Sequence, residues 1–145
     1  MLKVVIDTNV LVSALLKSGS VPDLVLSFIL EKKLIMCLSQ AIATEYEEVL
    51  ERAKFKKLDR KEVKNLIARL KSNALWAEPN FRLEVAKLDP DDNKFLECAQ
   101  AAGADFLVTG NTKHFPPEKF KKTRIATPAG FLLHIAKALA DKEEK

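Results

Sequence analysis

The residues LKVVIDTNVLV, Leu2–Val12, predict a strand followed closely by a helix. Its first half is mostly apolar and β-branched, which is typical of a strand buried in a parallel sheet. The apolar run breaks at Asp7-Thr8-Asn9, and apolar residues then resume from Val10 to Leu16, long enough to begin a helix. Open α/β sheets place their ligand sites where a strand ends just before a helix. We therefore take Asp7 as the anchor of a candidate active site.

Length and composition favour one folded domain. The chain has 145 residues, of which 48% are hydrophobic and 30% are charged, as expected for a globular protein with a real core. The formal net charge of +4 permits a polyanionic partner without proving one. We expect a single domain over residues 1–140, followed by a frayed tail over residues 141–145.

The two cysteines and the apolar runs indicate a cytoplasmic protein. Cys37 and Cys98 both lie among apolar residues, so we expect buried free thiols. No Cys/His cluster has the spacing of a zinc site. No apolar run approaches the length of a membrane span, and the chain enters a strand at once. We therefore expect no signal peptide and no membrane partner.

Short apolar runs alternate with longer amphipathic ones, which predicts βαβ units and an α/β fold with a mostly parallel sheet. The expected strands cover residues 2–6, 34–38, 74–77, 105–109 and 123–126. The expected helices cover residues 10–16, 22–32, 40–53, 60–73, 90–102 and 128–140. Ser39, Asp59 and Asp89 are the expected caps at helix starts, and Gly103 is the expected stop.

Two of these helices carry an acid at the edge of the apolar face. In the helix over 40–53, Glu45 lies roughly 60° from Ile42 at about 100° per residue. Its alternative role is that of a rim glutamate with a solvated carboxylate. In the helix after residue 90, Asp92 lies on the apolar stripe and Asp91 only slightly further round, so periodicity does not choose between them. Acids in a first turn also stabilise a helix through its macrodipole, which is the alternative role here.

Polar residues also lie at the exit of the expected strand over 105–109. Thr109 and Asn111 suit ordinary turn chemistry, and they are also short oxygen ligands at the carboxyl edge of the sheet. Asp7, Glu45 and Asn111 can all face that edge. Asp92 reaches it only if its helix packs with its N-terminus nearby.

Carboxylates that converge without basic partners repel one another unless a cation lies among them. Oxygen ligands select hard cations, here Mg²⁺ or Mn²⁺. Such an ion activates water and stabilises charge on a phosphodiester during hydrolysis.

The order and spacing of four motifs resemble those of PIN-domain nucleases, of the VapC-like kind found as toxins in prokaryotic toxin–antitoxin pairs. The resemblance extends over residues 2 to 135, roughly. The motifs are VIDTNV at 5–10, Ser39 with Glu45 six residues on, DPDDN at 89–93 with Ala99 seven residues after Asp92, and LVTGNTKHF at 107–115.

The resemblance implies a three-layer α/β/α sandwich with a parallel five-stranded sheet in the order 3-2-1-4-5. It also implies metal ligands at Asp7, Glu45 and Asp92, and so selects Asp92 over Asp91. Thr8 and Asn9 are implied to shape the turn that presents Asp7.

Three further positions follow from the same resemblance. Thr109 is implied to form a hydrogen bond near the site. Many members of the family carry Asp where Asn111 stands, so this chain keeps a neutral oxygen ligand but lowers the charge of the site. His114 stands where another acid is common, and either packs beside Phe115 or contacts a phosphate.

We therefore predict a Mg²⁺- or Mn²⁺-dependent endoribonuclease that hydrolyses RNA phosphodiester bonds. Asp7, Glu45 and Asp92 hold the metal, Asn111 assists, and no side-chain nucleophile takes part. The candidate contacts to substrate phosphate are Lys113, His114, Lys121 and Lys122.

The expected partners are RNA, a cognate antitoxin protein and a second copy of the chain. Two other functions stay open at this point. With the fourth acid replaced, the domain can be a catalytically idle module that binds RNA or dimerises. A phosphotransfer enzyme with Asp7 as nucleophile is disfavoured, because no second aspartate follows two residues on.

Overall fold

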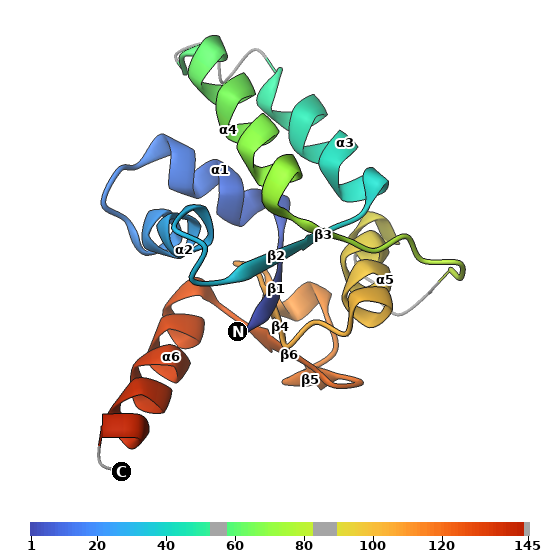
Figure 1. Ribbon diagram of the computed structural model, residues 1–145. Coiled ribbons are helices and arrows are strands. Elements are labelled where there is room, and N and C mark those ends of the chain that lie inside the picture. Colours follow the sequence, from blue (N-terminus) through green and yellow to red (C-terminus); the bar gives the residue numbers. More distant parts are fainter. Residues whose placement is uncertain (53–57, 83–89, 144–145) are drawn as a thin grey trace.

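The computed structural model describes residues 1–52, 58–82 and 90–143, which form a central sheet with helices around it (Figure 1). The strands are β1 (Lys3–Ile6), β2 (Ile35–Leu38), β3 (Leu75–Trp76), β4 (Phe106–Val108), β5 (Lys119–Phe120) and β6 (Thr123–Ala126). The helices are α1 (Thr8–Leu16), α2 (Val21–Leu30), α3 (Gln40–Leu50), α4 (Arg60–Asn73), α5 (Asn93–Ala102) and α6 (Pro128–Glu143). The short 3₁₀ helices are η2 (Pro90–Asp92) and η3 (Thr112–His114).

The sheet has six strands in the order β3-β2-β1-β4-β6-β5, and its β3, β2, β1, β4 and β6 strands run parallel. These five are the strands expected from the sequence, in the expected order. The difference is β5, which pairs antiparallel with β6. This short strand lies in the stretch 110–120 that we expected to be a loop. The turn between β5 and β6 is made possible by Lys121, whose φ of 55° is left-handed.

Helices cover both sides of the central strands. Helix α5 packs against β1, β2 and β4, while α1 and α2 lie on the other side of β1 and β2 (Figure 1). Because β1 and β4 are covered on both faces, Val4, Val5 and Val108 are fully buried. The structure thus confirms the α/β fold with helices around a central parallel sheet.

The junction between β1 and α1 has fewer residues than expected. Helix α1 begins at Thr8 rather than Val10, because Asp7 itself is the N-cap, with φ −62° and ψ 143°. The expected caps at Ser39 and Asp59 and the left-handed stop at Gly103 are confirmed. The chain therefore passes from strand to helix at the single residue that we took as the anchor.

Two helix boundaries elsewhere differ from expectation. The expected cap Asp89 lies outside the described residues. The segment that follows forms the 3₁₀ turn η2 before α5 begins at Asn93. Helix α6 extends through Glu143, into the segment expected to fray.

Neither cysteine is exposed. Cys37 and Cys98 are free thiols, and burial raises their pKa to about 11 and about 12. Within the described ranges, no single helix is long and apolar enough to cross a membrane. Helices α1 and α2 reach that length and composition only together, as a pair bent by 102°.

Candidate active site

Asp7 lies at the carboxyl end of β1 and is 4% exposed. Its Oδ1 accepts a 3.5 Å hydrogen bond from the Asn9 backbone N–H, and its Oδ2 accepts a 2.7 Å bond from the Thr109 hydroxyl. Burial raises the pKa of the Asp7 carboxyl, and the negative charge of Glu45 raises it further, whereas the hydrogen bonds from Thr109 and Asn9 oppose the shift. Its carboxylate is therefore fixed in direction and costly to ionise.

Tyr46 supports this strand end from α3. Its side chain is 1% exposed, and its hydroxyl donates to the carbonyl of Ile6, the residue before Asp7. Because a buried carbonyl needs a donor, this bond fixes the backbone that carries Asp7.

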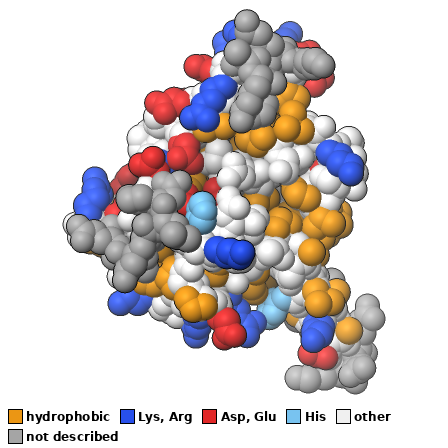
Figure 2. Space-filling model, turned by 180° about the vertical axis from the view of Figure 1, so that it is seen from behind, with side chains coloured by type: hydrophobic (Ala, Val, Ile, Leu, Met, Phe, Trp, Pro, Cys, Tyr) orange, Lys and Arg blue, Asp and Glu red, His pale blue; other side chains and the backbone are white. Residues whose placement is uncertain are grey.

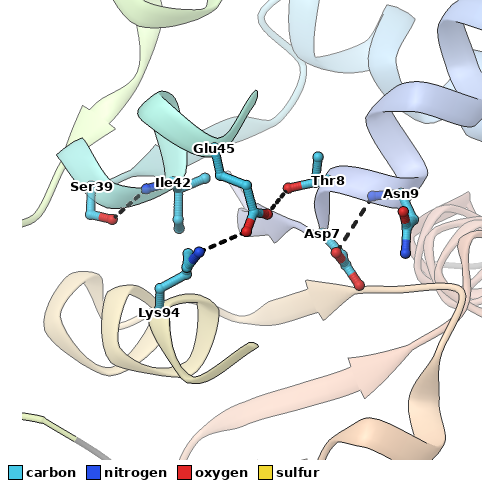
Figure 3. Close-up of polar contacts among 7 residues, drawn as sticks. All are labelled: Asp7, Thr8, Asn9, Ser39, Ile42, Glu45 and Lys94. Carbon is cyan, nitrogen blue, oxygen red and sulfur yellow. Dashed lines mark hydrogen bonds and ion pairs between the residues drawn. The ribbon is translucent and has the colours of Figure 1, made fainter. Parts of the chain in front are cut away.

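Glu45 points from α3 toward the start of α1 (Figure 3). Its Oε2 accepts a hydrogen bond from the Thr8 hydroxyl, and its Oε1 lies 2.6 Å from the Lys94 ammonium on α5. The two side chains of this ion pair are 23% and 24% exposed, so the pair is largely shielded from water. Glu45 therefore joins three helices beside Asp7.

Asp92 stands at the start of α5, where its Oδ2 lies 3.0 Å from His114 Nδ1. The Asp92 side chain is 14% exposed, whereas Asp91 is exposed to solvent. The N-terminus of α5 thus packs against the loop after β4, which is the condition under which Asp92 reaches the carboxyl edge of the sheet.

A chain of hydrogen bonds connects Asp92 to Asp7 along this loop. The Thr109 hydroxyl, which donates to Asp7, also accepts from the Asn111 N–H at 3.0 Å. The Asn111 carbonyl accepts from the His114 N–H at 2.9 Å, and the His114 ring contacts Asp92. Asn111 therefore takes part in the site through its backbone, while its side chain is exposed.

The donor set consists of oxygen atoms, which is the set that Mg²⁺ and Mn²⁺ prefer. Among the described residues, Asp7 has no Lys, Arg or His partner, although a buried carboxylate is costly to leave unpaired. A divalent cation would supply that missing charge, so the chemistry of these residues fits the ion. The described side chains do not group three His, Cys, Asp or Glu residues tightly enough to hold a metal. Glu45 is paired with Lys94, and Asp92 with His114.

The expected phosphate contacts lie in two places. Lys113 and His114 belong to η3, in the loop that follows Thr109. Lys121 and Lys122 precede β6, at the amino ends of the parallel strands, whereas Thr109 follows the carboxyl end of β4. Along β6 these two levels are about five residues apart, which is roughly 16 Å of strand. The β5–β6 hairpin carries these two lysines away from Asp7. Figure 2 shows the Lys and Arg side chains of one face standing apart, with no continuous basic strip visible there.

The sequence did not point to Lys94 or to the hydroxyl of Tyr46. Lys94 follows Asp92 by two residues, and its pairing with Glu45 depends on how α3 and α5 pack, which periodicity does not give. Tyr46 lies on the apolar stripe of α3, and its side chain is buried in the core. Its polar atom is the one signal that a buried partner was needed.

Sequence comparisons find related proteins. A family profile described as PIN domain matches residues 3–113. The uncharacterized protein MJ1680 of Methanocaldococcus jannaschii is 31% identical over 112 residues, which cover 76% of this chain and 71% of that protein.

A solved structure shows the same fold. It is a chain from the crystal structure of VapBC2 from Rickettsia felis, which is bound to a DNA fragment from the VapBC2 promoter. The match has a TM-score of 0.55 at 17% identity and covers 86% of this chain and 97% of that one.

Proposed function

This chain belongs to the PIN domain family, and from that membership we propose that it is a metal-dependent endoribonuclease. PIN domains are generally nucleases. The observation that carries the proposal is the buried Asp7 carboxylate, which is held in direction from both sides and lacks a basic partner among the described residues. That is the state in which a carboxylate binds a cation strongly.

Asp7, Glu45 and Asp92 are the residues that would hold Mg²⁺ or Mn²⁺, and Asn111 assists through its backbone N–H, which binds the Thr109 hydroxyl that holds Asp7. When bound, a divalent ion supplies water activation and charge stabilisation in phosphodiester hydrolysis. The chain contributes the orientation of the acids, because Thr109 and the Asn9 N–H fix the two oxygens of Asp7. Lys94 neutralises Glu45 and competes with a cation for it.

Lys113 and His114 are the proposed contacts to substrate phosphates. Both belong to η3, whose backbone is hydrogen-bonded to Asn111. The Lys113 ammonium in this place attracts a polyanion, so RNA affinity should fall as salt rises.

The proposal is tested by cleavage of single-stranded RNA by purified protein. We expect cleavage with Mn²⁺, its loss on chelation by EDTA, and its return when Mn²⁺ is added in excess. Glu45→Gln should lower the rate at least about tenfold, the effect expected of losing a charged group at the reacting centre. The matched control is Glu48→Gln, on the exposed side of α3, which should cleave as the wild type does. Equal rates in both variants contradict the role of Glu45.

A second candidate function is a catalytically idle module that binds RNA or dimerises. The observation that favours it is the pairing of Glu45 with Lys94 and of Asp92 with His114, since each acid already has a partner. Calorimetric titration with Mn²⁺ separates the two functions. An idle module shows no heat of metal binding at millimolar Mn²⁺ while its fold stays intact.

A cognate antitoxin is the proposed protein partner, supported by the shared fold with a chain of the VapBC2 complex. Val21 and Leu24 on α2 are 41% and 46% exposed, which makes α2 one candidate surface for that partner or for a second copy. The α3 surface is the other. Co-expression with any short reading frame found next to its gene tests the antitoxin by co-purification, and light scattering of the chain alone tests the second copy. We also propose that the protein acts in the cytoplasm.

A further inference from the structure

A cavity of about 470 Å³ opens beside Asp7, on the side opposite Glu45. Figure 3 shows Asn9, one of the lining residues, on that side of Asp7. The first turns of α1, α2 and α6 and the turn after β4 form its walls. Its volume lies within the range of small-ligand sites, about 300–1,000 Å³.

Two walls of this cavity are connected to the Asp7 carboxylate by hydrogen bonds, one directly and one through Thr109. The Asn9 N–H binds one carboxylate oxygen, and Thr109 binds the other while accepting from the Asn111 N–H. Asn9 and Asn111 are thus held in fixed positions relative to Asp7. A group bound between them is held next to whatever reacts at Asp7.

The lining of the cavity is uncharged. Among the described residues, its polar side chains are those of Asn9, Ser13, Asn111 and Thr127, and none of its lining side chains is Lys, Arg, Asp or Glu. The carboxamides of Asn9 and Asn111 are exposed, and neither forms a hydrogen bond with any described residue. Both therefore offer a donor and an acceptor to a ligand.

The facing wall is apolar. Pro22 and Pro128, at the starts of α2 and α6, contribute their rings, and Val21 lies beside them. A flat ligand with polar edges and apolar faces fits such a cavity. An anion is disfavoured, since no cationic side chain from the described part of the chain lines the cavity.

We propose that this cavity binds one unstacked base of the RNA, beside the scissile phosphodiester, and that Asn9 and Asn111 contact the edge of the base. The proposal rests on the proposed nuclease function and names a substrate subsite of the same site. Sequence-selective recognition of RNA commonly takes single-stranded bases whose edges accept such hydrogen bonds. A carboxamide is well suited to this contact, because it pairs with a base edge through both its donor and its acceptor.

The test fills the cavity without touching the acids. Ala129 is exposed on the first turn of α6 and lines the cavity, so Ala129→Trp blocks it. The matched control is Ala136→Trp, exposed two turns further along the same helix. The first readout is kcat/KM, measured on a short single-stranded RNA and on the same RNA with an abasic ribose beside the cleaved bond. The second readout is the change in amide NMR signals on addition of each of the four nucleosides or of inorganic phosphate.

We expect Ala129→Trp to lower kcat/KM on the intact RNA at least about fivefold, the lower end of the effect of one lost bidentate base contact. The abasic RNA should be cleaved equally by the wild type, Ala129→Trp and Ala136→Trp. At least one nucleoside should shift the amide signals of Gly110 and Asn111 in the wild type and in Ala136→Trp, but not in Ala129→Trp.

The outcomes separate this proposal from the proposed function. RNA cleavage that is equal in Ala129→Trp and wild type overturns the base subsite and leaves the nuclease function standing. Absence of RNA cleavage in all proteins overturns the nuclease function. The cavity is then judged by nucleoside binding alone, and a shift with inorganic phosphate but with no nucleoside overturns the base subsite.

Discussion

The Thr109 hydroxyl lies 2.7 Å from Asp7 Oδ2, although 102 residues separate the two in the chain. The contact exists because β1 and β4 are parallel neighbours, with Ile6 opposite Val108, so both strands end at the same level. The Asp7 N–H also donates to the Val108 carbonyl at 3.0 Å. The position of the candidate site is therefore a direct consequence of strand register.

Thr109→Val removes this hydroxyl with almost no change in shape. The side chain is fully buried, so we expect a loss of about 1–3 kcal/mol in the free energy of unfolding. We also expect lower RNA cleavage, because Asp7 and the Asn111 N–H lose their shared partner. Urea denaturation and cleavage rates are the measurements.

Thr123→Val is the matched control for that variant. Thr123 is 1% exposed and donates to the Ala104 carbonyl at 2.8 Å, away from Asp7. It should lose similar stability and keep its cleavage rate. A parallel fall in rate in both variants would mean that stability alone explains the effect of Thr109→Val.

Asp7→Asn is expected to stabilise the metal-free protein at neutral pH. The folded-state pKa of Asp7 lies above the unfolded value near 3.8, so the ionised carboxylate costs stability above both values. As pH falls through the raised folded pKa toward 3.8, the folded state takes up the proton and the cost disappears. The advantage of Asp7→Asn should therefore be present at pH 7 and shrink toward pH 4, as measured by thermal unfolding in EDTA.

Saturating Mn²⁺ should make the wild type more stable than Asp7→Asn, the reverse of the order expected without metal. Ligands that bind only the folded state raise its stability, so Mn²⁺ should raise the Tm of the wild type more than that of Asp7→Asn. Equal Tm shifts in the two proteins would show that the ion binds elsewhere.

Lys94→Met should tighten Mn²⁺ binding, because it frees Glu45 from its ion pair. The pair is only partly exposed, so we expect a stability loss of up to about 1 kcal/mol and a Kd for Mn²⁺ lower by about two- to fivefold. Calorimetry measures both the affinity and the heat of binding.

Lys71→Met gives the comparison for Lys94→Met. Lys71 on α4 pairs with Glu47 on α3 at 3.1 Å. Like the Lys94–Glu45 pair, this one joins a lysine to a glutamate of α3. Its loss should leave the Mn²⁺ affinity unchanged. A similar change in both variants would indicate a general effect of net charge.

Tyr46→Phe should lower stability by about 1–2 kcal/mol, because the Ile6 carbonyl loses a buried donor. Since Ile6 precedes Asp7, a moderate fall in kcat with little change in KM should accompany it. Denaturation and steady-state cleavage kinetics check both effects, and an unchanged kcat would limit the role of Tyr46 to the core.

Local sequence patterns predicted most of the fold. The apolar run of Leu2–Ile6 predicted the buried central strand, and the caps Ser39, Asp59 and Gly103 predicted helix ends that the structure confirms. The antiparallel β5 was not predicted, because its two residues carry no alternation and its turn uses a lysine in a left-handed conformation. Short strands that depend on a neighbour lack a local signal.

The candidate site was less predictable than the fold. Asp7 is visible in sequence because a strand-end acid before a helix has a local pattern. Lys94 and His114 contact Glu45 and Asp92 only through the packing of α5 against α3 and against the loop after β4. Such contacts between distant segments have no periodic signature, so the charge balance of the site had to come from the structure.

The role of Asp7 in metal-dependent RNA hydrolysis is tested by the rates at which wild type and Asp7→Asn cleave single-stranded RNA in Mn²⁺. We expect cleavage by the wild type that EDTA abolishes, and a rate at least about a hundredfold lower for Asp7→Asn. Cleavage by folded Asp7→Asn at the wild-type rate would contradict it.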